Sequence, residues 1–122
     1  MIKEINSGIN LFVEAAQGMK AYDIIILDVK GISSVTDCFI ICSGRSNRQV
    51  TAICEFIKIN LKEKGIDPVS IEGAKDGQWA LIDYGHVIIH VFLDVVREFY
   101  NIEGLWLDAK KTVISDKGDL VQ

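Results

Sequence analysis

The sequence predicts a single α/β (α+β) domain, with a mixed β-sheet of about five strands and helices mainly on one face. Two kinds of segment lead to this class. Residues 23–31 and 38–44 are apolar and β-branched without polar alternation, which is typical of strands covered on both faces. Residues 46–64 instead repeat apolar side chains at helical spacing. The 122 residues are the size of one domain, and the elements follow in the order α-β-β-α-β-β-β-α.

The first predicted element is a helix that begins at Asn6 or Ser7, since either side chain can cap it, and that ends near Gly18. Its apolar positions are Ile9, Phe12, Val13 and Ala16. The two apolar strands follow it along the chain. These elements already require a layer of helix packed on a sheet.

The second helix, over residues 46–64, has the strongest pattern in the chain. Its apolar stripe consists of Val50, Ile53, Cys54, Ile57 and Leu61. Ser46 and Gln49 have the spacing of a capping box. Gly65 ends the helix, and Pro68 prevents its continuation.

Residues 77–92 predict a β-hairpin with two different faces. Placing Tyr84 and Gly85 at the centre of the turn, where Gly supplies a positive φ, sets Trp79 opposite His90. One face is then aliphatic and packs on the helices: Ala80, Ile82, Val87, Ile89 and Val91. The other face mixes apolar and titratable groups: Trp79, Leu81, Asp83, His86, Ile88, His90 and Phe92. A one-residue slip would mix the two sets, so the pattern favours this register.

The mixed face, which bears Trp79, has two interpretations. Because the predicted helices cover mainly one side of the sheet, we expect this face to be open, and an exposed patch containing Trp marks an interface more often than free surface. Alternatively, the C-terminal segment around Leu105 and Trp106 covers Trp79 and Phe92. The pattern favours the interface.

The rest of the chain adds little regular structure. We expect a short strand at residues 69–73 and a short helix at residues 94–106 with a turn around Gly104. Residues 1–107 then form the domain. Residues 108–122 form a C-terminal tail, with one apolar triplet at residues 112–114, that is either mobile or weakly docked.

Composition argues against several function classes. The formal net charge of −4 disfavours direct binding of nucleic acid and suits a basic protein partner. The longest apolar stretches are far shorter than the ~20 residues that cross a bilayer, and the N-terminus lacks the pattern of a signal peptide, so we expect a cytoplasmic protein without a membrane partner. The cysteines show no C-x-x-C pair and are interpreted as small buried hydrophobes: Cys38, Cys42 and Cys54.

The titratable residues of the hairpin do not predict a metal site. His86 and His90 would lie about 13 Å apart on one strand face, too far to bind one metal ion. We expect His86 to pair with Asp83 and His90 to stack on Trp79 instead. Their predicted roles are structural or recognitional.

One alternative function is a degenerate nucleotidyltransferase domain that still binds nucleotides. The turn within residues 43–50, with Gly44 before the helix, could present backbone N–H groups to a phosphate. Such enzymes also need a pair of acidic residues on the following strand to hold two metal ions, and that strand has only Glu72. We therefore favour the capping box and expect no catalytic residue, metal or cofactor.

Four separated motifs occur together in the chain: DIIILDVKGISSVTDCFIICSGRSNRQV, EG, GQWALIDYGHVIIHVF and REFYNIEGLW. In this order and spacing they resemble the ribosomal silencing factor family, also called RsfS or Iojap-like proteins, over residues 7–107. The resemblance implies a homodimeric, non-enzymatic domain with nucleotidyltransferase-like topology but no catalytic carboxylates. It also implies binding to the large ribosomal subunit through ribosomal protein L-fourteen, which blocks association with the small subunit and represses translation under nutrient limitation.

The resemblance also implies site residues. The family's Trp-x-Leu-x-Asp-Tyr-Gly motif and its strand histidine fall on the face that bears Trp79, or on the turn beside it. Glu72 offers a second carboxylate besides that of Asp83. The expected partner-binding residues are therefore Trp79, Leu81, Asp83, Tyr84, His90 and Glu72. The chain departs from the family at His86, where an acidic residue is common, and around Leu93, Val95 and Val96, where more polar or acidic residues are common. Attraction to a basic partner is therefore expected to be weaker at that edge.

Overall fold

The structure, a computed structural model, describes residues 7–114 and 120–121. Its helices are α1 (Ser7–Gln17), α2 (Asn47–Glu63), α3 (Asp94–Tyr100) and the 3₁₀ helix η2 (Ile102–Leu105). Its strands are β1 (Tyr22–Asp28), β2 (Cys38–Gly44), β3 (Ser70–Glu72), β4 (Trp79–Asp83), β5 (Val87–Leu93), β6 (Lys110–Ile114) and β7 (Leu120–Val121). The predicted cap Asn6 lies outside the described residues. The predicted helix at 94–106 is divided at Asn101, which has a left-handed φ of 44°.

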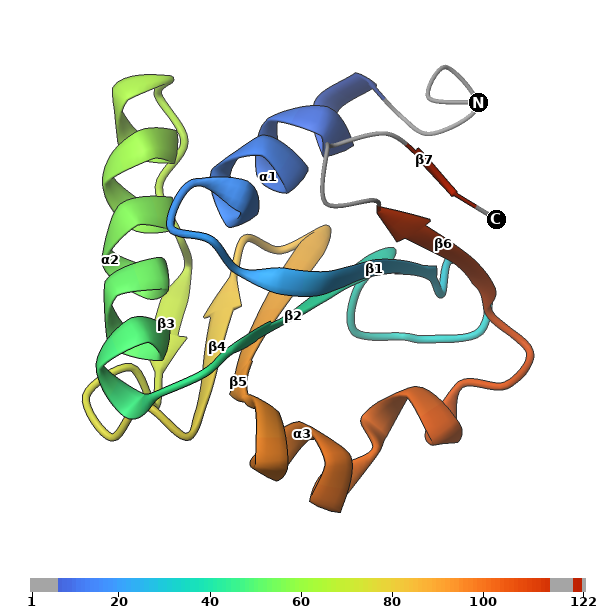
Figure 1. Ribbon diagram of the computed structural model, residues 1–122. Coiled ribbons are helices and arrows are strands. Elements are labelled where there is room, and N and C mark those ends of the chain that lie inside the picture. Colours follow the sequence, from blue (N-terminus) through green and yellow to red (C-terminus); the bar gives the residue numbers. More distant parts are fainter. Residues whose placement is uncertain (1–6, 115–119, 122) are drawn as a thin grey trace.

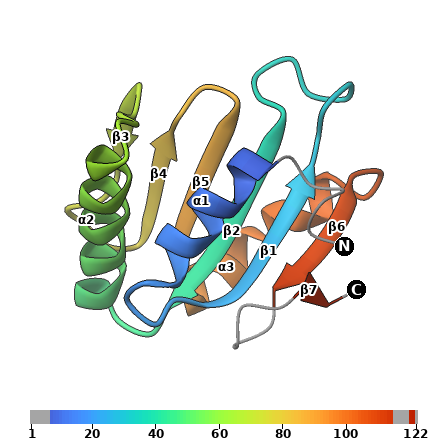
Figure 2. The same cartoon turned by 90° about the horizontal axis from the view of Figure 1, so that it is seen from above.

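All strands join one mixed sheet in the order β3-β4-β5-β2-β1-β6-β7. Neighbouring strands are antiparallel except β2 and β5, which are parallel. The two long helices, α1 and α2, cover one face, and the shorter α3 and η2 lie on the other (Figures 1 and 2). The predicted α/β (α+β) class with helices mainly on one face is therefore confirmed.

The sheet separates two apolar cores. The larger lies under α1 and α2 and includes the stripe predicted for α2. The smaller lies under α3 and η2 and includes Leu27, Phe39, Ile41, Phe92 and Ile102. Every residue of β2 is buried, which explains why this strand shows no polar alternation. The three cysteines are buried as predicted, and burial raises the pKa of each thiol to about 12: Cys38, Cys42 and Cys54.

The C-terminal segment differs from its prediction. Residues 108–122 were expected to lie outside the domain, but Lys110–Ile114 forms β6 and pairs with β1 along four residues. The pairing buries Thr112 and Ile114 and satisfies backbone groups that β1 would otherwise expose as an edge strand. It also contributes to the strand number, which is seven against the predicted five or so. The prediction failed because a five-residue strand with two lysines has almost no apolar pattern.

The hairpin between β4 and β5 has the predicted faces but a different register. Trp79 faces Phe92, two residues beyond the predicted partner, His90. The two central residues of the turn are Gly85 and His86, because the Tyr84 N–H donates to the Val87 carbonyl across it. Gly85 has a φ of 89°, which a two-residue hairpin turn accepts at its first central position. A shift of two residues preserves the alternation, so each side chain of the two strands still points to its predicted face. His86 is the exception: it lies in the turn, and its ring packs against Phe12 of α1 with 5.6 Å between centroids.

Gly73, which follows β3, is required by its contact with β4. Its φ is 78°, and an added Cβ would lie 2.2 Å from the Trp79 carbonyl oxygen. We expect Gly73→Ala to lower the free energy of unfolding by about 3 kcal/mol, because a left-handed φ and a backbone clash act together. Gly65→Ala is the matched control: its φ is 80° but nothing lies within 4 Å, so only about 1 kcal/mol should be lost. Urea denaturation measures the free energy of unfolding of both variants. Equal losses in the two would show that the clash with β4 is unimportant.

Candidate partner-binding surface around Trp79

The predicted site residues lie along the edge formed by β3, β4 and β5. Residues that face each other across strands share one side of the sheet, so Glu72, Leu81 and His90 form one row. Two rows flank it on the same side of the sheet. Trp79 and Phe92 form one of them, and Ser70, Asp83 and Ile88 form the other. This side is the one opposite α1 and α2. The register therefore brings together five of the six predicted residues.

The chain itself covers part of this face, contrary to the expectation that it is open. Phe92 and His90 are buried, with exposures of 0% and 6%. The Tyr100 ring of α3 packs on Trp79 with 4.9 Å between ring centroids, and Trp106 packs on Phe39 at 5.4 Å. The alternative, cover by the segment around Leu105 and Trp106, is also only partly right, because Tyr100 rather than that segment contacts Trp79.

The part of the face over β3 and β4 stays accessible to a partner. Glu72 is exposed, whereas Trp79, Leu81 and Asp83 are half-buried. We call these four residues the Trp79 surface. It combines an indole and a leucine side chain with two carboxylates, so it can bury apolar area and pair with cations at once.

His90 positions Trp79 and is itself inaccessible. The Trp79 Nε1–H donates to His90 Nδ1 at 3.0 Å. The two rings are tilted by 37° with their centroids 6.0 Å apart, so the predicted stacking is replaced by a hydrogen bond. Because Nδ1 accepts, the ring proton is assigned to Nε2, which is buried and has no hydrogen-bond partner among the described residues. Burial lowers the His90 pKa from 6.5 to about 4, so the ring is neutral at pH 7.

The His90 shift predicts a pH dependence of stability. The folded-state pKa is depressed, so the stability associated with neutral His90 is complete above pH 6.5 and is lost as the pH falls toward 4. We expect the wild type to lose about 3 kcal/mol of unfolding free energy relative to His90→Phe when the pH falls from 7 to 4. Denaturation curves of both proteins across this range measure it. A difference that does not change with pH would show that His90 is not held neutral in the folded state.

Tyr84 does not belong to the surface, contrary to prediction. It lies on the other side of the sheet, is 7% exposed, and packs against the Phe12 ring of α1 at 5.1 Å. The motif suggested otherwise because Tyr84 is adjacent in sequence to Asp83, but neighbouring residues point to opposite faces. The predicted pairing of Asp83 with His86 is also not formed. Asp83 Oδ1 accepts a hydrogen bond from the Gly85 N–H at 2.7 Å, and the His86 ring packs edge-on against Phe12 at 5.6 Å.

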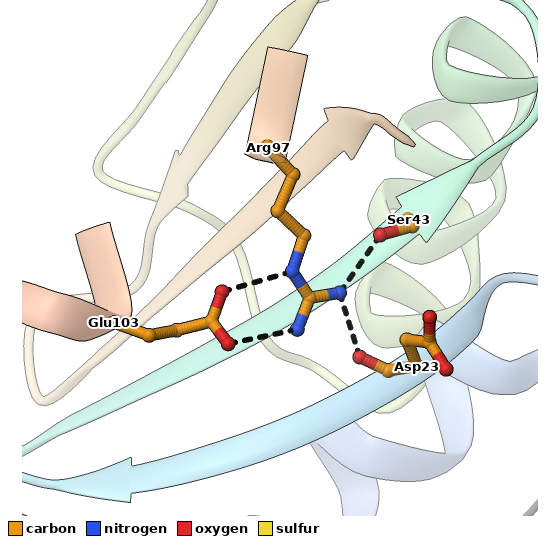
Figure 3. A network of polar contacts seen from close by, with 4 residues as sticks. All are labelled: Asp23, Ser43, Arg97 and Glu103. Carbon is orange, nitrogen blue, oxygen red and sulfur yellow. Dashed lines mark hydrogen bonds and ion pairs between the residues drawn. The ribbon is translucent and has the colours of Figure 1, made fainter. Parts of the chain in front are cut away.

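Arg97, which the sequence analysis missed, holds α3 against the sheet (Figure 3). Its Nε and Nη2 donate to the two carboxylate oxygens of Glu103 at 3.0 and 3.4 Å. Its Nη1 donates to the Asp23 carbonyl at 2.7 Å and to Ser43 Oγ at 2.8 Å. The guanidinium thereby ties α3 to η2, β1 and β2. One sequence signal was available: Arg97 is the only Lys or Arg between residues 76 and 109.

A second contact fixes the start of α3. The Tyr22 hydroxyl donates to Asp94 Oδ2 at 2.6 Å, and burial together with this carboxylate raises the Tyr22 pKa to about 12. The ring of Tyr22 also lies 4.3 Å from the Arg45 guanidinium. The first residue of α3, Asp94, and its middle residue, Arg97, are therefore both fixed to the sheet by polar contacts.

The alternative phosphate site at the start of α2 gains no support. Ser46 Oγ accepts from the Gln49 N–H at 3.0 Å, and Gln49 Oε1 accepts from the Arg45 N–H at 2.6 Å. The first bond is that of the predicted capping box, whereas the reciprocal bond comes from Arg45, the residue before the cap, rather than from Ser46 itself. Together they occupy two backbone donors of the turn within the chain. Among the described residues, no three His, Cys, Asp or Glu side chains are grouped so that they could hold a metal ion. In the same part of the chain, no helix is both long and apolar enough to span a membrane.

Comparison with known proteins identifies the family. The profile described as "Ribosomal silencing factor during starvation" matches residues 2–121. The ribosomal silencing factor RsfS of Chromobacterium violaceum is 43% identical over 103 residues, 84% of each chain. A crystal structure from that organism has a TM-score of 0.77 at 42% identity, over 87% of this chain and 86% of the other.

A more distant relative is the mouse protein named "Mitochondrial assembly of ribosomal large subunit protein 1". It is 34% identical over 101 residues, which cover 80% of this chain and 44% of the mouse protein. The family profile spans nearly the whole chain, including β6, which the motif-based resemblance had left outside the domain. The chain therefore belongs to the ribosomal silencing factor family.

Proposed function

We propose that this protein silences ribosomes by binding the large subunit and preventing its association with the small subunit. The observation that carries the proposal is the Trp79 surface, an apolar and acidic patch on a family member whose described residues show no metal-binding cluster. The name of the mouse relative supports the large subunit as the partner. The expected contact is ribosomal protein L-fourteen, and the expected consequence is lower translation when nutrients are scarce.

The chemistry of the surface suits a basic protein partner. Glu72 and Leu81 lie opposite each other on neighbouring strands, so a carboxylate stands directly beside an apolar side chain. Asp83 lies two residues along the same face of β4. Arg or Lys side chains of the partner can pair with the two carboxylates while Trp79 and Leu81 are buried against its apolar groups. Two of the predicted contact residues do not touch the partner in this proposal. Tyr84 is buried on the other side of the sheet, and His90 only positions the Trp79 ring.

Steric exclusion needs affinity and position but no chemical step. We therefore propose a non-enzymatic protein without a cofactor, located with the ribosomes in the cytoplasm. The resemblance further implies a homodimer, which sedimentation equilibrium of the purified protein tests directly.

A subunit-joining assay tests the proposed function. Separated small and large subunits are mixed in joining buffer with increasing amounts of the protein, and the products are resolved on a sucrose gradient. We expect the peak of joined ribosomes to fall and the protein to migrate with free large subunits. Ile59→Ala, a change on the outer side of α2, should inhibit equally well and serves as a control. An unchanged peak at saturating protein would contradict the proposal.

A further inference from the structure

The exposed apolar side chains of the protein are concentrated in one short segment. Ten large apolar residues are exposed among the described residues, and five of them fall within residues 95–107. They are Val95, Phe99, Tyr100, Leu105 and Leu107, and we call them the α3 surface. Phe99 is 80% exposed and Leu107 is 86% exposed. Such a concentration of apolar side chains marks an interaction site more often than free surface.

Apart from Tyr100, which packs on Trp79, these side chains are at least 66% exposed and add little to holding the segment in place. No residue of α3 is fully buried. The anchors are the Arg97 and Asp94 contacts described above, which use the inner side of the helix. Apart from Tyr100, the outer apolar side chains therefore contribute little to folding, although the helix that carries them is fixed to the sheet. This combination suits recognition.

The α3 surface continues the Trp79 surface through three rings. Trp79 packs on Tyr100 at 4.9 Å, and Tyr100 packs edge-on against Phe99 at 5.1 Å. The rings lead from the half-buried indole on the sheet to the most exposed aromatic side chain among the described residues. A partner that covers Trp79 and Tyr100 therefore meets Phe99 next.

The charges around these residues favour a basic partner over a second copy of the chain. Residues 94–108 contain four carboxylates and one guanidinium, a net charge of −3. The guanidinium of Arg97 is already paired with Glu103, while Glu98 and Asp108 are exposed. Two copies that met through this face would bring like charges together, whereas a basic surface would be attracted.

We propose that the outer side of α3 and η2 is a second contact region for the same basic protein partner, with Phe99 as its anchor. The inference rests on the proposed function and extends it, because it makes the interface a composite of sheet edge and helix. An exposed Phe that becomes buried at the centre of an interface can act as a hot spot, and the acidic rim then orients the partner.

Phe99→Ala tests this inference. The affinity for purified large subunits, measured by co-sedimentation, should fall about 30-fold. The thermal unfolding midpoint should stay within about 1 °C of the wild type, because the ring is already in solvent. Ile59→Ala is the matched control: it also removes an exposed apolar side chain, but from the opposite layer of the molecule. Its affinity should equal that of the wild type.

Comparison with Trp79→Ala separates failure of this inference from failure of the proposed function. If Trp79→Ala loses affinity and Phe99→Ala does not, the second contact region is refuted and the function stands. If neither variant loses affinity, both the region and the proposed binding site are wrong. If Phe99→Ala dissociates a dimer but binds subunits normally, the face serves self-association and the inference is overturned.

Discussion

Replacing Arg97 with Met is expected to lower the free energy of unfolding by about 3 kcal/mol. The guanidinium is nearly enclosed, with 11% of its side chain exposed, and the partner Glu103 has 24% exposed. Its removal leaves that carboxylate without its cation, and also removes the donor to Ser43 Oγ and to the Asp23 carbonyl. Breaking a buried pair from one side costs more than removing both charges, because an uncompensated charge remains.

A double-substitution cycle distinguishes this cause from lost packing. Arg97→Met combined with Glu103→Gln should recover about 1 kcal/mol, since no unpaired charge is left. Arg97→Lys should lie between the wild type and Arg97→Met, because one ammonium cannot reproduce the fork of contacts. Glu103→Gln alone completes the cycle, and urea denaturation of the five proteins gives the values, because urea does not screen the ion pair. A loss below about 1 kcal/mol for Arg97→Met would mean that α3 is held by other contacts.

Replacing Trp79 with Ala is expected to weaken binding to large subunits about 30-fold or more, equivalent to about 2 kcal/mol. The change removes the largest apolar group of the Trp79 surface and its contact with Tyr100. Trp79→Phe keeps a ring but loses the donor to His90 Nδ1, so a smaller loss is expected. Co-sedimentation of each variant with purified large subunits measures the affinities.

The experiment requires a control for stability, because Trp79→Ala also removes a half-buried ring and should cost on the order of 2 kcal/mol of folding free energy. Val50→Ala provides that control, since Val50 is buried on the inner side of α2, in the other core. This variant is destabilised but should bind like the wild type. Equal losses of affinity in both variants would show that stability, not the Trp79 surface, explains the effect.

The parts of the fold that the sequence predicted are those with strong local patterns. The two strands without polar alternation are β1 and β2, and the apolar stripe of α2 is buried as expected. The faces of the hairpin were also correct, although its register was wrong by two residues. Burial decides the face of a strand, whereas the turn decides the register, and the sequence allowed two positions for the turn around Gly85.

The cover over the Trp79 face could not be predicted in the same way. A seven-residue helix such as α3 is too short to show a periodic pattern, and its outer residues are as apolar as its inner ones. Its position depends on Arg97, whose contacts to Ser43 and Asp23 span 54 and 74 residues of sequence. Contacts of that separation have no local signature, so strand alternation predicted the side of the sheet on which Leu81 lies but not the cover beside it.

A cryo-electron microscopy structure of the protein bound to large subunits tests the proposed binding mode most directly. We expect Trp79 and Leu81 to lie against ribosomal protein L-fourteen, with Asp83 and Glu72 within ion-pair distance of its Arg or Lys side chains. A complex in which these side chains face solvent, while another surface of the protein contacts the subunit, would contradict this binding mode.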